Sequence, residues 1–353
     1  MSDYDYGNPR VRAMRSRLLS NDQLNNLAET GHLEGYISVL SQTPYKSALE
    51  AAMAIAEGID GIQEALHIDM IETAKKIQGF YGGQAATYLK LWMLRVDLHN
   101  LKTILRGLSQ SFMHAEIFPL LLPIGEIPVS ILRQLIKTGN TREAVDLMVT
   151  LNLPCALPLL EVRAEHPGAD NAALELALEK WYFRTVNETL AKVPKDSIDL
   201  KQALEMEADF FNLLTALRFA YHPEARQHAK EPIRDLFVGP GAISFDILEK
   251  VSQQDQLESA VELLVGSFYA SPIQAGLEAF KRSRRLSEFE IYLRRFRLQW
   301  MADQIRKNPL GIGVLLGYAA LKLNEISNLL WIAKGISLKM SSKQIKDNLE
   351  FAK

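Results

Sequence analysis

The sequence is nearly free of cysteine, and this excludes two common kinds of stabilisation. Cys155 is the single cysteine among 353 residues, so the chain can form neither an internal disulfide nor a zinc site with several cysteine ligands. Long apolar runs are also scarce. The longest notable uncharged stretch, residues 308–321, is too short and too rich in glycine for a transmembrane helix, which needs about 20 apolar residues. We therefore expect a protein of a reducing, cytoplasmic setting that does not cross a membrane.

The sequence also lacks a large excess of positive or negative charge. The formal net charge is -2, which gives no overall field that would concentrate nucleic acid or anionic lipid. The first residues mix acids with arginines instead of forming an apolar segment, so we expect no signal peptide. Hydrophobic residues make up 48% of the chain and charged residues 23%, proportions typical of a globular protein with a sizeable core. The length predicts more than one domain.

Motifs for nucleotide chemistry and metal binding are absent from the sequence. No Gly-x-x-x-x-Gly-Lys-Ser/Thr stretch is present, and Gly311, Gly313 and Gly317 have the wrong spacing for a dinucleotide turn, which favours close helix packing instead. No two histidines stand four residues apart, the spacing that would place two metal ligands on one helix face. Glu205 and Asp209 share a helix face, but such pairs are usually solvated or salt-bridged. We therefore expect no catalytic residue, no cofactor and no metal site.

A short helical motif recurs three times at nearly constant spacing. In each copy an acid is followed three residues later by an Asn-Leu pair, and the motif ends in a base. The acid recurs after 112 and then 116 residues. A second landmark consists of three segments that align without gaps, residues 27–32, 135–140 and 251–256, and it recurs after 108 and then 116 residues. Two landmarks in register predict three homologous repeats of about 110 residues. The motif positions, which we predict to be structural, are Asp97, Asn100, Leu101, Asp209, Asn212, Leu213, Glu325, Asn328 and Leu329.

Apolar residues within the repeats follow a helical period. They recur at three-and-four spacing, and no sustained strand alternation is found. The pattern predicts an all-α fold of three homologous helical lobes, which we place at residues 1–120, 121–238 and 239–353. One helix is expected to begin soon after Gly83 and to end at Gly107, because glycine readily adopts the left-handed backbone conformation that ends many helices.

The recurring asparagine has two interpretations, because asparagine is a poor residue for a helix interior. It could face solvent and pair with the acid three residues earlier on the same helix face. Alternatively, it could be buried, with its amide bonded to the backbone of a neighbouring helix whose register it fixes. The sequence leaves this choice open, and neither interpretation is catalytic.

Basic residues are concentrated in two segments. Residues 10–17 contain four arginines, and residues 281–307 contain nine basic residues against three acids. Nucleic acid could bind such a surface. The arginines of the second segment alternate with apolar residues at amphipathic helical spacing, however, and no nucleic-acid-binding motif surrounds them. Contact with a protein or with anionic lipid headgroups is the more economical interpretation.

Segments at both ends of the chain carry a resemblance to a known family. Residues 6–19, which read YGNPRVRAMRSRLL, resemble the N-terminal signature of the C subunits of archaeal-type and bacterial V-type ATPases, the counterparts of the d subunit of the eukaryotic vacuolar enzyme. Residues 290–295, 311–314 and 321–329 are similar to the last lobe of the same family. The chain departs from the family pattern at Asn8-Pro9, where an alanine usually precedes the first arginine. A second departure is the leucine after Asn-Leu in the third motif, where an arginine is common.

The resemblance implies a funnel of three pseudo-symmetric lobes, peripheral to the membrane and seated on the cytoplasmic mouth of a ring of rotor subunits. The implied partners are the D and F subunits of the central stalk, the rotor ring and the cytoplasmic part of the stator, with no nucleic acid, small-molecule substrate or cofactor. The implied function is non-catalytic coupling of the rotating shaft to the ring in a V/A-type ATPase or ATP synthase. The alternative is a helical-repeat adaptor that binds a protein in a groove, although such repeats normally have about 34 to 47 residues.

Overall fold

Helices are the only regular structure in the part of the chain that the computed structural model describes, residues 3–165, 170–192, 198–228 and 231–352. The predicted all-α class is therefore confirmed for these residues. The chain divides into two compact units: unit 1 contains Met1–Ala156 and Ala302–Lys353, and unit 2 contains Leu157–Met301. The division into three lobes stays a prediction.

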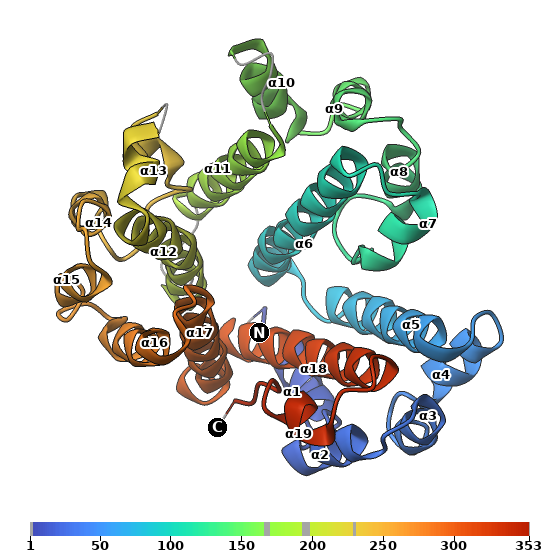
Figure 1. Cartoon of the computed structure of the whole chain (residues 1–353). Coiled ribbons are helices and arrows are strands. Elements are labelled where there is room, and N and C mark those ends of the chain that lie inside the picture. Colours follow the sequence, from blue (N-terminus) through green and yellow to red (C-terminus); the bar gives the residue numbers. More distant parts are fainter. Residues whose placement is uncertain (1–2, 166–169, 193–197, 229–230, 353) are drawn as a thin grey trace. The chain divides into compact units, whose positions relative to one another are not determined.

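Long and short helices follow one another in a recurring order (Figure 1). The repeated motif lies on three long helices, α6 (Gly83–Ser109), α12 (Ile198–Tyr221) and α18 (Gly313–Ser337). The remaining elements are α1 (Gly7–Arg15), α2 (Asn21–Glu29), α3 (Leu33–Leu40), α4 (Lys46–Met53), α5 (Gly58–Gln78), α7 (His114–Ile117), α8 (Val129–Leu135), α9 (Thr141–Thr150), α10 (Ala156–Glu165), α11 (Asn171–Leu190), α13 (Pro223–His228), α14 (Phe245–Ser252), α15 (Leu257–Glu262), α16 (Ala270–Ser283), α17 (Ser287–Lys307) and α19 (Ser342–Lys346), with the 3-10 turns η1 (Phe118–Leu120) and η3 (Ile233–Leu236).

In unit 1 the two ends of the chain share one core. The helices α1, α2, α3 and α5 pack against α18, and α2 also packs against α19 (Figure 1). Leu27 and Tyr36 from the N-terminal helices are fully buried together with Leu329 and Ile332 of α18, and the Tyr36 hydroxyl donates to the Leu329 carbonyl at 3.0 Å. Burying one such apolar side chain contributes about 1.5 to 3 kcal/mol. The N-terminal helices are therefore an integral part of the C-terminal core.

Asn8 anchors the first helix to the other end of the chain. Its side-chain amide donates to the Gly311 carbonyl at 3.0 Å, and its oxygen accepts from the Tyr81 hydroxyl at 2.9 Å. Pro9 lies in the first turn of α1, where backbone N–H groups have no acceptor within the helix, so the N–H that proline lacks is not missed there. The Asn-Pro departure from the family pattern is thus accommodated by specific contacts within unit 1.

Unit 2 builds a comparable arrangement from consecutive residues. The helices α14 and α15 pack against α12, and α16 packs against α15 (Figure 1). Leu213 and Leu217 on α12 are buried against Leu248 of α14, Val261 of α15 and Ile273 of α16. Short helices of this length are not stable alone in water, so their burial against the long helix is what holds them in place.

The second sequence landmark is a junction between two short helices. His32 and Asn140 end the first two copies of the landmark, and each is the N-cap of the helix that follows, α3 or α9. Their side chains accept the backbone N–H of Gly35 and Glu143, at 2.9 and 3.0 Å. Gln256 stands at the same place before α15 but makes no side-chain cap. The landmark therefore marks equivalent turns.

The predicted C-terminal end of the first long helix is wrong. Helix α6 begins at Gly83 as expected, but it continues past Gly107 to Ser109, and the residue with positive φ is Ser111, at 57°. Gly107 is buried at the point where Ile117 packs against the helix, and a Cβ there would overlap the isoleucine side chain. The glycine permits close packing of α7 on α6 and does not stop the helix.

Candidate functional site: a repeated carboxylate and asparagine clamp

The asparagine of each long helix binds the backbone of one downstream loop. Asn100 donates its amide hydrogen to the Leu122 carbonyl and accepts the Leu122 N–H, both at 2.7 Å. Asn328 forms the same reciprocal pair with Glu350, at 2.7 and 3.1 Å. A side-chain amide carries both a donor and an acceptor, so it can bind a backbone N–H and a backbone carbonyl at the same time. Each pair therefore ties a loop to a helix.

Asn212 forms the corresponding pair with two adjacent residues. It donates to the Gly239 carbonyl at 2.8 Å and accepts the Val238 N–H at 2.9 Å. All three asparagines are at most 3% exposed. The buried interpretation thus describes these residues, except that the backbone they bind belongs to a loop and not to a neighbouring helix. The leucines that follow them are buried as well, namely Leu101, Leu213 and Leu329.

The acid of the first motif binds the same loop a few residues further along. Asp97 accepts the backbone N–H of Glu126 at 2.8 Å and that of Ile127 at 3.0 Å. Gly125 precedes these donors, and a Cβ at this position would overlap the carboxylate. Glycine therefore lets the loop approach the acid, and the acid and asparagine together clamp residues 122–127 onto α6.

The second motif repeats this clamp and adds a hydroxyl. Asp209 accepts the N–H of Ala242 at 2.9 Å and that of Ile243 at 3.2 Å, and Gly241 provides the same close approach. The Tyr269 hydroxyl donates to the same carboxylate at 2.8 Å. Bonds to a charged acceptor are stronger than bonds between neutral groups, so the two backbone donors hold this loop firmly, and the hydroxyl ties the start of α16 to the same acid.

The third motif takes its donors from the other end of the chain. Glu325 accepts the backbone N–H of Leu19, and the Tyr45 hydroxyl donates to it at 2.6 Å. Leu19 precedes Ile127 and Ile243 by 108 and 224 residues, the same offsets that separate the copies of the second landmark. The N-terminal segment therefore occupies the position that a following loop holds in the other two clamps.

One clamp residue of each repeat was not predicted from the sequence. Tyr45 and Tyr269 are also separated by 224 residues, and this shared offset is the signal that could have found them. Cys155 is the corresponding residue beside Asp97: like Tyr45, it follows a proline, and burial together with the nearby Asp97 carboxylate raises the pKa of its thiol to about 12. The single cysteine is therefore a buried thiol of low reactivity, at the position that a tyrosine holds in the other two repeats.

Burial changes the acidity of the two aspartates. It raises the pKa of Asp97 and of Asp209 to about 6 from the ordinary value of 3.8, although the backbone N–H bonds act in the opposite direction. Between pH 4 and pH 6 the folded chain keeps protons that the unfolded chain has released. The free energy of unfolding therefore falls as the pH rises through this window, and the contribution is complete below pH 4.

The Asp209→Asn variant is expected to lack one part of this pH dependence. Asparagine does not titrate, so the stability of the native chain relative to the variant should decline on the order of 3 kcal/mol from pH 4 to above pH 6 and then stay level. Urea unfolding of both proteins at half-unit pH steps measures the difference. A constant difference across the window would show that Asp209 keeps its ordinary acidity.

The basic segment at residues 281–307 is largely paired with acids in the described part of the chain. Such exposed pairs add little stability, but they reduce the positive charge available to phosphates. The pairs are Lys281 with Glu278, Arg285 with Glu288, Arg294 with Glu290, Arg297 with Glu207, and Arg306 with Asp303.

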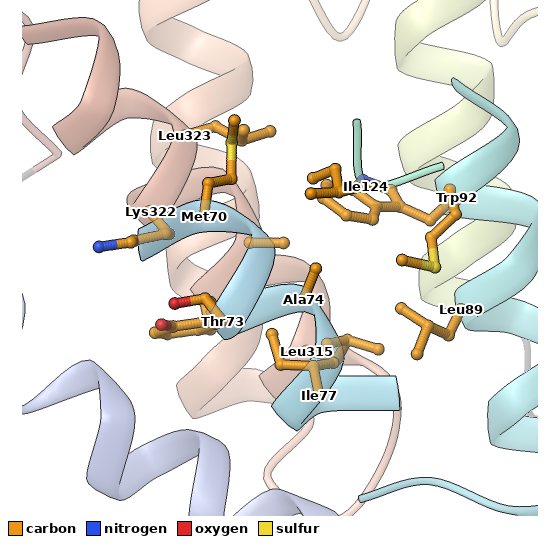
Figure 2. A pocket seen from close by; sticks show the side chains of 13 residues that line it. Met70, Thr73, Ala74, Ile77, Leu89, Trp92, Ile124, Leu315, Lys322 and Leu323 are labelled. Carbon is orange, nitrogen blue, oxygen red and sulfur yellow. The ribbon is translucent and has the colours of Figure 1, made fainter. Parts of the chain in front are cut away.

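A small apolar cavity lies between α5, α6 and α18 of unit 1 (Figure 2). Its volume is about 30 Å³, far below the roughly 300 to 1,000 Å³ of sites for small organic ligands. Lys322 is its one charged lining residue, and Figure 2 shows the amine directed away from Leu89 and Trp92. Within the described residues, no cluster of three or more histidine, cysteine or acidic side chains has metal-binding geometry, and no helix is both long and apolar enough for a membrane crossing.

These features define an all-helical protein in which a long helix with an acid-asparagine clamp recurs along the chain. The chain belongs to the ATP synthase (C/AC39) subunit family, whose model matches residues 7–348. The resemblance inferred from the sequence is thereby confirmed.

Two of the proteins similar to this chain match it over nearly its whole length, and a third matches part of it. The A-type ATP synthase C subunit of Methanocaldococcus jannaschii is 24% identical over 351 residues, which cover 99% of this chain and 86% of that protein. The corresponding protein of Pyrococcus furiosus is 25% identical over 363 residues, with 98% and 89% covered. The V-type ATP synthase C subunit of Deinococcus radiodurans is 28% identical over 215 residues, with 61% and 60% covered.

Proposed function

We propose that this chain is the non-catalytic central-stalk subunit of a rotary V/A-type ATPase or ATP synthase. It joins the rotating shaft, formed by the D and F subunits, to the ring of membrane rotor subunits, and so couples ATP turnover to proton or sodium transport. The observation that carries the proposal is the match of the family over residues 7–348, because it spans nearly the whole chain. The relatives from the three organisms are all C subunits of ATP synthases.

The clamps support a body of three homologous lobes with pseudo-threefold symmetry. The same acid-asparagine pair lies on α6, α12 and α18, and the three acids bind the N–H groups of Ile127, Ile243 and Leu19, which stand at equivalent positions of the repeats. Several similar surfaces on one body can contact a ring of identical subunits at once, which gains avidity without a single strong site. The lobe boundaries near residues 120 and 238 remain part of this proposal.

The clamps also suit a mechanical role. A protein that transmits torque must resist shear, and close-packed helices deform little. Each clamp adds buried hydrogen bonds between a long helix and its loop, and bonds of this kind fix one arrangement of the two elements. Such a joint needs no reactive group. It would lie peripherally on the cytoplasmic face of the membrane, within reach of the cytoplasmic part of the stator.

Affinity purification of the tagged full-length chain from its own cells in mild detergent tests this proposal. We expect the D and F subunits and the rotor-ring protein to co-elute at stoichiometric amounts and to be identified by mass spectrometry. A helical-repeat adaptor would instead elute alone or with proteins unrelated to an ATPase, and this result would reject the central-stalk role.

A further inference from the structure

The third clamp differs from the other two because no following loop connects its acid to the backbone N–H that the acid binds. Asp97 and Asp209 are 30 and 34 residues away from the N–H groups of Ile127 and Ile243, whereas Glu325 is 306 residues away from Leu19. Closing a tenfold longer connection lowers the effective concentration of its ends by about 30-fold, since this concentration falls with roughly the 3/2 power of length. The third clamp therefore needs other contacts to close.

A buried charged cluster is present at this clamp. The Lys322 amine lies 2.8 Å from an Asp69 carboxylate oxygen, 2.7 Å from the Tyr45 hydroxyl oxygen and 3.2 Å from a Glu325 carboxylate oxygen. Its side chain is only 11% exposed. The cluster joins α18 to α5 and to the residue that precedes α4, and Glu325 extends it to Leu19 before α2.

The cation of this cluster has no counterpart in the other two motifs. Lys322 stands three residues before its acid, and the residues at this position are Leu94 before Asp97 and Met206 before Asp209. Burying the charge of a lysine lowers the stability of the fold unless the charge is paired, so an apolar residue would be expected at this position too. The lysine occurs only on the helix whose clamp partner lies at the far end of the chain.

We propose that Lys322, Asp69, Tyr45 and Glu325 form a latch that closes the C-terminal repeat onto the N-terminal helices. The latch replaces the covalent loop that connects the acid to its N–H donors in the other two clamps. Lys322 forms an ion pair with each of the two carboxylates and thereby holds α18 against α5, while Tyr45 and Leu19 bring α4 and α2 to Glu325. The latch belongs to the chain's own closure, so it holds in the isolated protein whatever partners the protein binds.

Hydrogen exchange with mass spectrometry on the full-length chain tests the latch. The Lys322→Met variant places at this position the residue that α12 carries. We expect amides of α2, α3, α4 and α18 to exchange at least about tenfold faster together, while the helices packed on α12 stay unchanged. Tyr45→Phe removes only a hydroxyl and should give a weaker change with the same distribution, so it serves if Lys322→Met fails to fold.

Joining the two ends of the chain covalently distinguishes a latch from an ordinary buried ion pair. In a cyclised full chain, a flexible Gly/Ser linker joins the two termini and gives the third repeat the continuity that it lacks. Cyclisation should restore protection of α2 to α4 in Lys322→Met to within about threefold of the native chain. The matched control is Asp209→Asn. The clamp that this variant weakens is already closed by a continuous loop, so cyclisation should not restore the protection of α14 and α15. Faster exchange confined to the turn around Lys322, or a Lys322→Met variant whose protection of α2 to α4 cyclisation does not restore, would overturn the proposal.

Discussion

Loss of this chain from an otherwise intact ATPase is expected to reduce ATP-driven ion transport at least tenfold while ATP hydrolysis by the soluble sector largely persists. The reason is mechanical: the proposed joint holds no reaction centre, so its removal leaves the catalytic subunits complete but disconnects the shaft from the ring. Inverted membrane vesicles from a deletion strain allow both quantities to be measured, transport by quenching of a pH- or sodium-sensitive dye and hydrolysis by phosphate release.

Two controls sharpen this experiment. The native chain supplied from a plasmid should restore transport, and the exposed-site variant Gln202→Ala should restore it equally, because Gln202 is exposed on α12 and lies outside the repeated motif. The level of the other subunits in the vesicles should be matched by immunoblot, so that poor assembly is not mistaken for uncoupling. A deletion strain that pumps at the native rate would disprove the coupling role.

Replacement of Asn212 by leucine is expected to cost about 3 to 5 kcal/mol of folding free energy. The substitution keeps the approximate volume of the side chain but removes two hydrogen bonds, and it leaves the Val238 N–H and the Gly239 carbonyl without their partner. A buried polar group that loses its partner costs about 1 to 3 kcal/mol, and two such groups are affected. This is a large part of the roughly 5 to 15 kcal/mol by which a typical domain is stable.

Urea unfolding followed by circular dichroism measures this loss. Gln202→Ala, at an exposed position on the same helix, is the matched control and should change stability by less than about 0.5 kcal/mol, as exposed substitutions usually do. Asn100→Leu and Asn328→Leu should resemble Asn212→Leu, because each removes the same reciprocal pair from its own clamp. A loss below about 1 kcal/mol for Asn212→Leu would mean that the loop at residues 237–243 is held mainly by Asp209.

The helices and the positions of the motif residues could be predicted because both depend on local patterns. Apolar spacing indicated the helix that starts at Gly83, and the recurrence of Asn-Leu after an acid located Asn100, Asn212 and Asn328. The wrong end at Gly107 has a tertiary cause: the glycine is needed by Ile117, which packs on the helix from outside it. Local rules for helix ends contain no information about such a neighbour.

The partners of the motif residues could be predicted only in part. The offset of 224 residues between Tyr45 and Tyr269 was present in the sequence, but nothing local marks either tyrosine as a donor to a carboxylate. Cys155 was even harder to predict from the sequence, because its thiol stands where the other two repeats have a tyrosine hydroxyl, and the two side chains are chemically different. Nothing local marks Lys322 as a buried residue, because its burial depends on Asp69 and Tyr45, which lie more than 250 residues earlier.

The sequence by itself determined the helical class, the recurrence of the motif and the family, since these follow from spacing and from residue patterns along the chain. Only the tertiary structure decided that the first helices complete the core around α18 and that Glu325 takes its donors from the N-terminal segment. The physical reason is that repeats fix which residues are equivalent, whereas contacts across 306 residues depend on how the folded chain brings its ends together.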